Sequence, residues 1–195
     1  MGKVVAIDHL TLDGVMQGPG RGDEDTRDGF QYGGWALPRG DAALGSKMGE
    51  AMGSNFAFLF GRRTYEDLLA HWNAQGGPFK DALNNTPKFV ASRSVTTELD
   101  WPNSTLLSGE AVVDRVAELK QAGGVNLVIM GSGELTRSLI PASLVDEYLL
   151  MIHPIVLGCG RRLFAAGLEV ALTLIDATPT PTGVVIASYQ AGPAA

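Results

Sequence analysis

Residues 125–140 read V-N-L-V-I-M-G-S-G-E-L-T-R-S-L-I and form the clearest candidate for binding a ligand. The apolar run 127–130 predicts a strand that is buried on both faces of a parallel sheet. Glycine and serine at 131–133 break the run, and a helical pattern begins at Glu134. Such a turn leaves backbone N–H groups free for a phosphate, although an empty tight turn is an equal alternative. It is not a G-x-G-x-x-G fingerprint, because Thr136 replaces the third glycine.

Two other predicted strands also end in residues that suit a phosphate. The apolar run 56–60 is followed by Gly-Arg-Arg-Thr at 61–64, with Thr64 as the expected N-cap of a helix. The strand 88–91 is followed by Ser-Arg-Ser at 92–94. Arginine binds phosphate oxygens with two parallel hydrogen bonds, and a solvated basic pair is the alternative at the first turn. Ligands of open α/β sheets bind outside the carboxyl ends of the strands, so three such ends predict one shared site.

Two acids in the N-terminal part have either a chemical or a purely structural role. Asp13 lies in the turn Thr-Leu-Asp-Gly, where Asp-Gly is typical of a turn. Asp41 precedes a helix with Leu44 and Met48 on its apolar face, so it is a suitable N-cap. Between these acids, residues 18–34 are rich in Gly, Asp and Arg without periodicity. This composition indicates a lid or binding loop, with flexible disorder as the alternative.

Composition narrows the classes of function. The chain has 195 residues, 45% of them hydrophobic, and a net charge of −6, which fits one globular domain over residues 1–195. The chain has no run of Lys and Arg, which argues against a nucleic-acid surface. No apolar run reaches the roughly 18 residues of a membrane span. The apolar segment near the N-terminus is too short for a signal peptide. A single cysteine, Cys159, excludes an internal disulfide and lacks partner ligands, so we expect a cytoplasmic protein without a metal site.

The hydrophobic patterns predict an α/β fold. Early strands alternate with helices, and three strands without helices follow them. The last two suit an antiparallel pair at the edge of a mostly parallel central sheet, with proline kept to its margin. The predicted strands span residues 3–8, 56–60, 88–91, 105–107, 127–130, 146–157, 171–176 and 184–189. The predicted helices follow Asp41, run from Thr64 to His71-Trp72, and span 110–121 and 134–140.

Four motifs in this order resemble the dihydrofolate reductase-like superfamily. They are Thr-Leu-Asp-Gly at 11–14, Gly-Arg-Arg-Thr-Tyr-Glu at 61–66, Gly-Ser-Gly at 131–133 and H-P-I-V-L-G-C-G-R-R-L-F at 153–164. The first and last are typical of the branch that contains the reductase domain of riboflavin biosynthesis, the C-terminal domain of a bifunctional deaminase-reductase. The resemblance covers nearly the whole chain and implies the three-layer fold of this superfamily.

The resemblance also implies an NADPH site. Arg62 and Arg93, with Ser92, would hold the adenosine 2′-phosphate, and Arg63 would assist. An NADPH-selective site needs positive charge beside the ribose, which agrees with these arginines. The N-terminal turn at 11–17 would line the nicotinamide, which carries the hydride chemistry. The implied cofactor-binding residues are Gly61, Arg62, Arg63, Thr64, Ser92, Arg93, Gly131, Ser132, Gly133, Glu134 and Leu135.

The substrate side of the resemblance is less regular. Dihydrofolate reductases carry W-x-L-P-x-[DE], and this chain has Trp35 with one extra residue before Asp41. Trp35 and Asp41 are therefore the implied substrate-binding residues, and Asp41 and Asp13 the implied catalytic acids, while Asp41 remains equally suitable as an N-cap. A carboxylate in such a pocket would hydrogen-bond the edge of an aminopyrimidine.

The implied function is an NADPH-dependent reductase of a small heterocycle, resembling 5-amino-6-(5-phosphoribosylamino)uracil reductase. The alternatives are dihydrofolate reduction, a non-catalytic NADP-binding protein on the same fold, and an interaction module without a ligand. One cysteine cannot form the zinc signature of a deaminase, so we do not expect the bifunctional enzyme. The late apolar strands favour a homodimer, because an exposed apolar edge must be covered.

Overall fold

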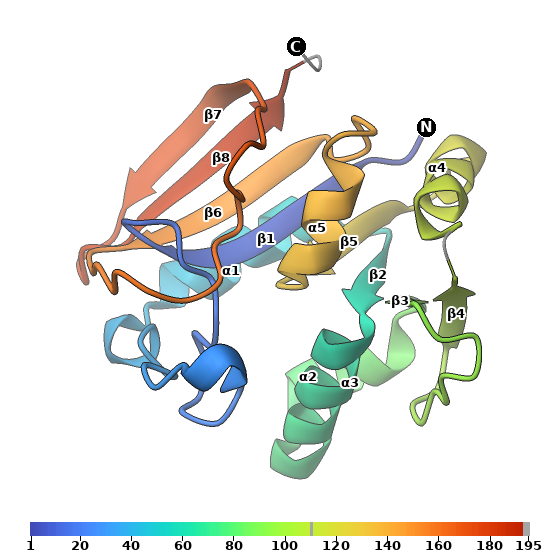
Figure 1. Ribbon diagram of the computed structural model, residues 1–195, viewed down its shortest axis with the longest axis horizontal. Helices are drawn as coiled ribbons and strands as arrows, with labels where there is room; N and C mark the ends of the chain where they lie inside the picture. Colours follow the sequence, from blue (N-terminus) through green and yellow to red (C-terminus); the bar gives the residue numbers. More distant parts are fainter. Residues whose placement is uncertain (110, 193–195) are drawn as a thin grey trace.

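One eight-stranded sheet forms the centre of the computed structural model, which describes residues 1–109 and 111–192 (Figure 1). In chain order its strands are β1 Val4–Thr11, β2 Phe56–Gly61, β3 Lys88–Ser92, β4 Ser104–Ser108, β5 Asn126–Met130, β6 Glu147–His153, β7 Leu172–Pro179 and β8 Val185–Ala191. The order across the sheet is β4-β3-β2-β5-β1-β6-β8-β7. The first six run parallel, β8 is antiparallel to β6, and β7 is antiparallel to β8. The predicted mostly parallel sheet with an antiparallel C-terminal pair is confirmed.

Helices cover both faces of this sheet, so the fold has three layers (Figure 1). The α-helices are α1 Ala42–Met52, α2 Arg62–Gln75, α3 Pro78–Asn85, α4 Val112–Ala122 and α5 Gly133–Leu139, and two short 3-10 helices are η1 Arg27–Gly29 and η2 Leu37–Arg39. Leu44 of α1 and Leu69 of α2 pack in the core on one face, and Val116 of α4 and Leu139 of α5 pack on the other. Among the described residues, no helix combines the length and the apolar character needed to cross a membrane.

Strand β5 is buried on both faces, as predicted. Leu127 and Ile129 pack in the core that contains α4 and α5, whereas Val128 packs in the core that contains α2 and α3. The strand pairs with β1 on one side and β2 on the other. This central position brings the glycine turn that follows β5 to the middle of the carboxyl rim of the sheet.

The long connection between β1 and α1 forms a small third core with the segment that follows β6. Val15, Phe30 and Trp35 are buried together there. The side-chain amide of Gln17 joins the two segments, since it donates to backbone carbonyls of the connection while its Oε1 accepts from the N–H of Arg161 at 3.0 Å. The connection is therefore packed onto the rim of the sheet by defined contacts.

The predicted start of α2 is wrong. Gly61 is the N-cap and the helix begins at Arg62, so Thr64 lies inside the first turn. Gly61 has extended backbone angles as the last residue of β2, and the chain passes from strand to helix without an intervening loop. The helix also continues beyond the predicted end at His71-Trp72, to Gln75.

Two further predictions need correction. The strand predicted over 146–157 ends at His153, because Pro154 has no N–H for a ladder hydrogen bond and the chain then turns into the small third core. Helix α3 was not predicted. It has eight residues and one fully buried side chain, Leu83, which is too short for a clear helical pattern. The predicted start of α4, at Glu110, lies outside the described residues.

Candidate functional site

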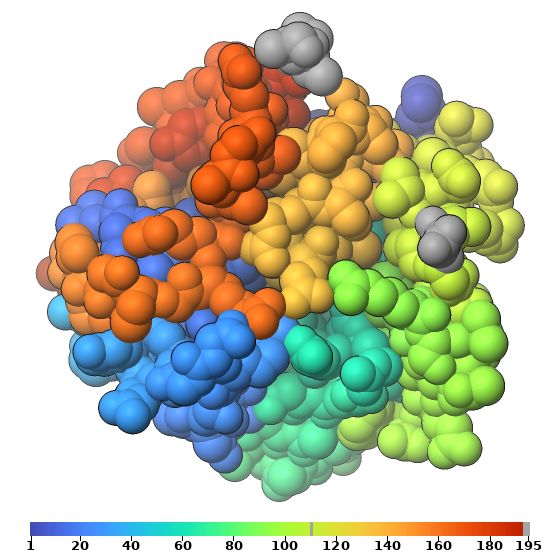
Figure 2. Space-filling view, viewed as in Figure 1, coloured from blue at the N-terminus to red at the C-terminus, as the bar shows by residue number. Residues whose placement is uncertain are grey.

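Three segments that are distant along the chain meet at the carboxyl rim of the sheet. Strand β2 pairs with both β3 and β5, so residues 61–64, 92–93 and 131–135 follow neighbouring strands. The N–H of Gly61 donates to Ser132 Oγ at 3.0 Å. In Figure 2 the teal start of α2, the green segment after β3 and the amber helix α5 border one another beside the blue N-terminal loop. The structure thus brings together the residues predicted to form one anion site.

The start of α2 offers both N–H donors and positive charge. No side chain in the described part of the chain caps this helix, which leaves the N–H groups of its first turn for a ligand. Arg62 makes an exposed ion pair with Glu66 at 2.8 Å, one turn further along the helix. The side chain of Arg63 is 59% exposed. Both guanidiniums are therefore accessible to solvent.

The turn after β3 is shaped by Ser92. This residue is buried, its Oγ lies 2.7 Å from Thr97 Oγ1, and it accepts a hydrogen bond from the N–H of Ser94 at 3.1 Å. The hydroxyl of Ser92 is thus engaged in fixing the turn. The side chain of Arg93, in contrast, is 96% exposed. Of the two, Arg93 is the residue that is free to contact a ligand.

The glycine turn after β5 uses the freedom of glycine at two points. Gly131 has φ +63, and Ser132 follows in the left-handed region with φ +59. A Cβ on Gly133 would clash with the side chain of Met16, which packs against the start of α5 here. Leu135 is buried in the core, and its backbone remains the part available to a ligand.

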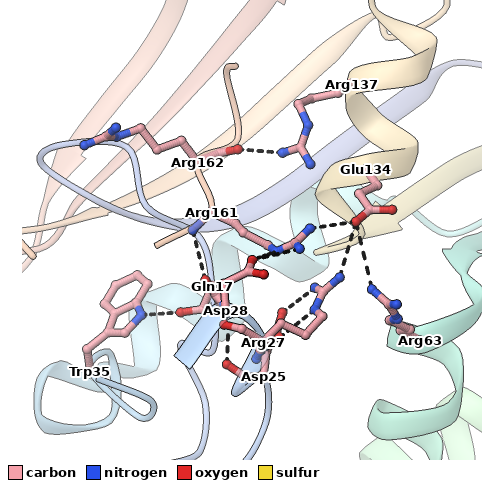
Figure 3. Close-up of polar contacts among 10 residues, drawn as sticks. All are labelled: Gln17, Asp25, Arg27, Asp28, Trp35, Arg63, Glu134, Arg137, Arg161 and Arg162. Carbon is pink, nitrogen blue, oxygen red and sulfur yellow. Dashed lines mark hydrogen bonds and ion pairs between the residues drawn. The ribbon is translucent and has the colours of Figure 1, made fainter. Parts of the chain in front are cut away.

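Glu134 lies at the centre of an arginine cluster, defined here as Arg27, Arg63, Arg93 and Arg161. Figure 3 shows Glu134 with Arg27, Arg63 and Arg161. Arg63 and Arg93 were predicted site residues, but Arg27 and Arg161 were not. The two missed arginines come from the loop over 18–34 and from the segment after β6. The excess of Arg and Asp in that loop was the signal for Arg27, and the Arg-Arg pair at 161–162 was the signal for Arg161.

Asp13, a predicted catalytic acid, bridges the N-terminal turn and the segment after β6. Its carboxylate accepts from Thr11 Oγ1 at 2.6 Å and from the N–H groups of Leu157 and Gly158 at 3.2 and 2.9 Å. The Thr11 hydroxyl and these N–H groups lower the pKa of Asp13 to about 2. The group is therefore ionised at neutral pH, and any role of Asp13 in proton donation remains a prediction.

The two predicted substrate residues, Trp35 and Asp41, both make hydrogen bonds within the protein. Asp41 is the N-cap of α1, and its Oδ1 accepts from the N–H of Ala43 at 2.9 Å. This contact shows the N-cap role directly, while a substrate contact remains a prediction. Trp35 is buried, and its indole N–H donates to the carbonyl of Gln17 at 2.8 Å. Its ring meets His153 edge-on, with centroids 5.2 Å apart.

A histidine pair, His9 and His153, lies at the carboxyl ends of β1 and β6. His9 Nδ1 is 2.9 Å from His153 Nε2. His153 is fully buried, and its Nδ1 has no hydrogen-bond partner among the described residues. Burial is the main cause that lowers the pKa of each histidine to about 4, and the charges of His153 and Arg39 contribute to the shifts of His9 and His153, respectively. Both imidazoles are neutral at neutral pH.

We expect this pair to make folding stability fall as the pH drops from about 6.5 to about 4. An unfolded histidine has a pKa of about 6.5. The folded chain binds fewer protons in this range, so acid favours unfolding, by about 2 kcal/mol for one such group. Urea denaturation at pH 7 and pH 4.5 measures the loss. His9→Gln should lose less stability than the wild-type protein over this interval, and equal losses would contradict the assignment.

Asp8 is a second buried group that the sequence patterns did not single out. Its side chain is 2% exposed, and Oδ2 has no hydrogen-bond partner among the described residues. Burial raises the pKa of Asp8 well above its usual range, and the charge of Arg137 offsets part of the shift. The neighbouring carbonyl of Ile7 accepts the N–H of Gly131 at 3.1 Å, so this acid lies close to the glycine turn.

The chain matches the family model described as RibD C-terminal domain over residues 3–186. The uncharacterized protein YyaP of Bacillus subtilis (strain 168) is 31% identical over 109 residues, which are 55% of this chain and 56% of that protein, so the match spans about half of the relative's length.

Two solved structures have a similar fold. A pyrimidine reductase-like protein from Corynebacterium diphtheriae has a TM-score of 0.66 at 12% identity, over 97% of this chain and 92% of that chain. Dihydrofolate reductase from Enterococcus faecalis, in complex with NADP(H) and RAB-propyl, has a TM-score of 0.61 at 16% identity, over 97% and 96% of the two chains. The expected dihydrofolate reductase-like fold is confirmed.

Proposed function

The chain belongs to the RibD C-terminal domain family, and on that premise we propose that it is an NADPH-dependent reductase of a small heterocyclic substrate. The observation that carries this proposal is the convergence of residues 61–64, 92–93 and 131–135 on one rim of the sheet, together with accessible arginines. A ligand with several phosphates fits such a rim, because guanidiniums and free N–H groups both favour anionic oxygens.

In this proposal each strand end has a separate task. Arg62 and Arg93 bind the adenosine 2′-phosphate, with Arg63 assisting. The free N–H groups at 61–64 and the backbone of the glycine turn at 131–135 bind the diphosphate. When bound, the cofactor supplies the hydride. The chain's own residues would orient it and exclude water, and the N-terminal turn at 11–17 would cover the nicotinamide.

The substrate is proposed to be a pyrimidine ribosylamine or a pterin, held on the side of Trp35 and Asp41. The His9–His153 pair lies next to Trp35, so neutral imidazoles and an indole border the same region. These groups hydrogen-bond and stack on heterocycles. The solved pyrimidine reductase-like and dihydrofolate reductase structures that share this fold support the choice of these two substrate classes.

A non-catalytic NADP-binding protein is the second candidate. The observation in its favour is that both expected catalytic acids, Asp13 and Asp41, already accept hydrogen bonds from backbone N–H groups. Turnover of a panel of pterins, flavins and pyrimidines with NADPH separates the two candidates. NADPH binding without oxidation by any member of the panel would favour the binding protein.

A homodimer in the cytoplasm completes the proposal. Strand β7 is one of the two outer strands of the sheet, and its Leu174 and Ile175 are 54% and 58% exposed. An apolar edge of this kind is normally covered by a partner. Light scattering at micromolar concentration should give twice the mass of the chain. A measured mass of one chain would contradict the proposed homodimer.

The cofactor proposal predicts saturable NADPH binding. Reduced-nicotinamide fluorescence should rise and shift on titration with the protein, with a dissociation constant in the micromolar range or below. NADH should bind at least about tenfold more weakly, since it lacks the phosphate that pairs with arginine. The absence of saturable binding for both nucleotides would remove the proposed function.

A further inference from the structure

One carboxylate, that of Glu134, lies among the four guanidiniums of the arginine cluster, and Figure 3 shows it with Arg27, Arg63 and Arg161. Its Oε1 is 2.8 Å from Arg161 Nη1, 3.3 Å from Arg27 Nη1 and 4.0 Å from Arg63 Nη1. Its Oε2 is 4.0 Å from Arg93 Nη2. The four arginines belong to four separate segments of the chain, so the single point that they share is the position of this acid.

The carboxylate is too small and too weakly charged for this environment. It makes hydrogen bonds to Arg27 and Arg161, but the distances to Arg63 and Arg93 are too long for a hydrogen bond. With Asp25 and Asp28 counted, three carboxylates face four guanidiniums, so the cluster keeps a net positive charge. A phosphate group has more oxygens and more charge, and it would reach donors on several sides at once.

Two other acids hold the missed arginines in place independently of Glu134. Arg27 pairs with Asp25, and Arg161 pairs with Asp28 at 2.9 Å. If Glu134 withdrew, both guanidiniums would still point toward the same position. Moving the side chain of Glu134 out of the cluster costs little free energy, because it is 47% exposed and ion pairs of this exposure contribute little to stability.

We propose that Glu134 occupies a phosphate position of the binding site and that a ligand phosphate replaces it, with Arg27 and Arg161 as its ligands and Arg63 beside them. Arg93 remains assigned to the adenosine 2′-phosphate. This inference rests on the proposed function for the source of the phosphate, which is either the diphosphate of the dinucleotide or a phosphate ester on the substrate. Glu134 thereby acts as an internal competitor. It keeps the arginines together in the free protein and lowers the affinity for anions.

The test is Glu134→Gln, with Glu118→Gln as the matched control. Glu118 is exposed and pairs with Arg115 on α4, so its replacement changes the net charge equally, away from the site. If Glu134 occupies the position for about nine-tenths of the time, its removal should raise the affinity for the replacing anion about tenfold. Calorimetric titration with NADP⁺, inorganic pyrophosphate, ribose 5-phosphate and adenosine 2′-monophosphate measures the change.

The four titrants distinguish the sources. A gain for NADP⁺ and pyrophosphate, without a gain for adenosine 2′-monophosphate, supports the diphosphate. A gain for ribose 5-phosphate alone supports a substrate phosphate. An equal gain for all four, or the same gain in Glu118→Gln, would show a general charge effect and overturn the inference. Unchanged or weaker anion binding in Glu134→Gln would also overturn the inference. Glu134 would then hold the arginines in place or contact the ligand directly.

The same titrations distinguish a failure of the proposed function from a failure of the inference about Glu134. If neither form binds NADP⁺ but Glu134→Gln still binds pyrophosphate more tightly, the phosphate position stands and the cofactor assignment falls. If the wild-type protein binds NADP⁺ and Glu134→Gln shows no gain, only the inference falls. Should Glu134→Gln not fold, Arg27→Ala in the wild-type protein replaces it. That variant should lose pyrophosphate affinity about tenfold, and no loss would overturn the role of Arg27.

Discussion

Replacing Arg62 and Arg93 together by alanine is expected to weaken NADPH binding about a hundredfold or more, while NADH binding changes by less than about threefold. Charge-assisted hydrogen bonds contribute about 1.5–3 kcal/mol each, and both arginines would lose theirs to the 2′-phosphate. Strands β2 and β3 pair up to Gly61 and Ala91, which brings the residues that follow them onto the same part of the rim. Fluorescence titration with both nucleotides measures the change.

Arg115→Ala is the control for the loss of a surface arginine. Arg115 lies on α4 and makes an exposed ion pair with Glu118, outside the predicted site. This control should bind both nucleotides as the wild-type protein does. Equal losses of NADPH and NADH affinity in the double variant would show that Arg62 and Arg93 do not recognise the 2′-phosphate.

Asp13→Ala is expected to destabilise the protein by about 3 kcal/mol. The substitution removes the acceptor for two N–H groups, those of Leu157 and Gly158, and for the hydroxyl of Thr11. Each partner left without a hydrogen bond costs about 1–3 kcal/mol if it stays buried, and partial hydration reduces the sum. The free energy of unfolding in urea at pH 7 measures the effect.

The contribution of Asp13 should also depend on pH in a defined direction. Its hydrogen bonds lower the pKa to about 2, below the ordinary value of an unfolded aspartate. The stabilisation is therefore fully present above about pH 4 and is lost as the pH falls through 2. Asp23→Ala, at a side chain that is 86% exposed, should change stability by less than about 0.5 kcal/mol. A loss no larger than this in Asp13→Ala would contradict the bridging role.

The sequence predicted the sheet well because its strands are short apolar runs that end in glycine or small polar residues. Strand β5 and the turn after it show this most clearly, since a run buried on both faces and a glycine break leave few alternatives. The helix start at Arg62 was missed because Gly61 ends a strand and caps a helix at once, and local cap preference favoured Thr64. Helix α3 has only one fully buried side chain, so its periodicity was too weak to detect.

Sequence patterns predicted only those residues of the candidate site that directly follow strands. Residues 61–64, 92–93 and 131–135 follow neighbouring parallel strands, and sheet geometry alone brings them together. Arg27 and Arg161 lie in segments without periodicity, and only tertiary contacts such as those of Gln17 bring them to Glu134. The pair His9–His153 depends on the register between β1 and β6, which a single sequence does not reveal.

A crystal structure of the protein with NADP⁺ tests the central claim most directly. We predict that the adenosine 2′-phosphate contacts the guanidiniums of Arg62 and Arg93 and that the diphosphate lies against the backbone of residues 131–135. A nucleotide bound away from this rim, or one whose 2′-phosphate points into solvent without an arginine partner, would contradict the assignment of these strand ends to a cofactor.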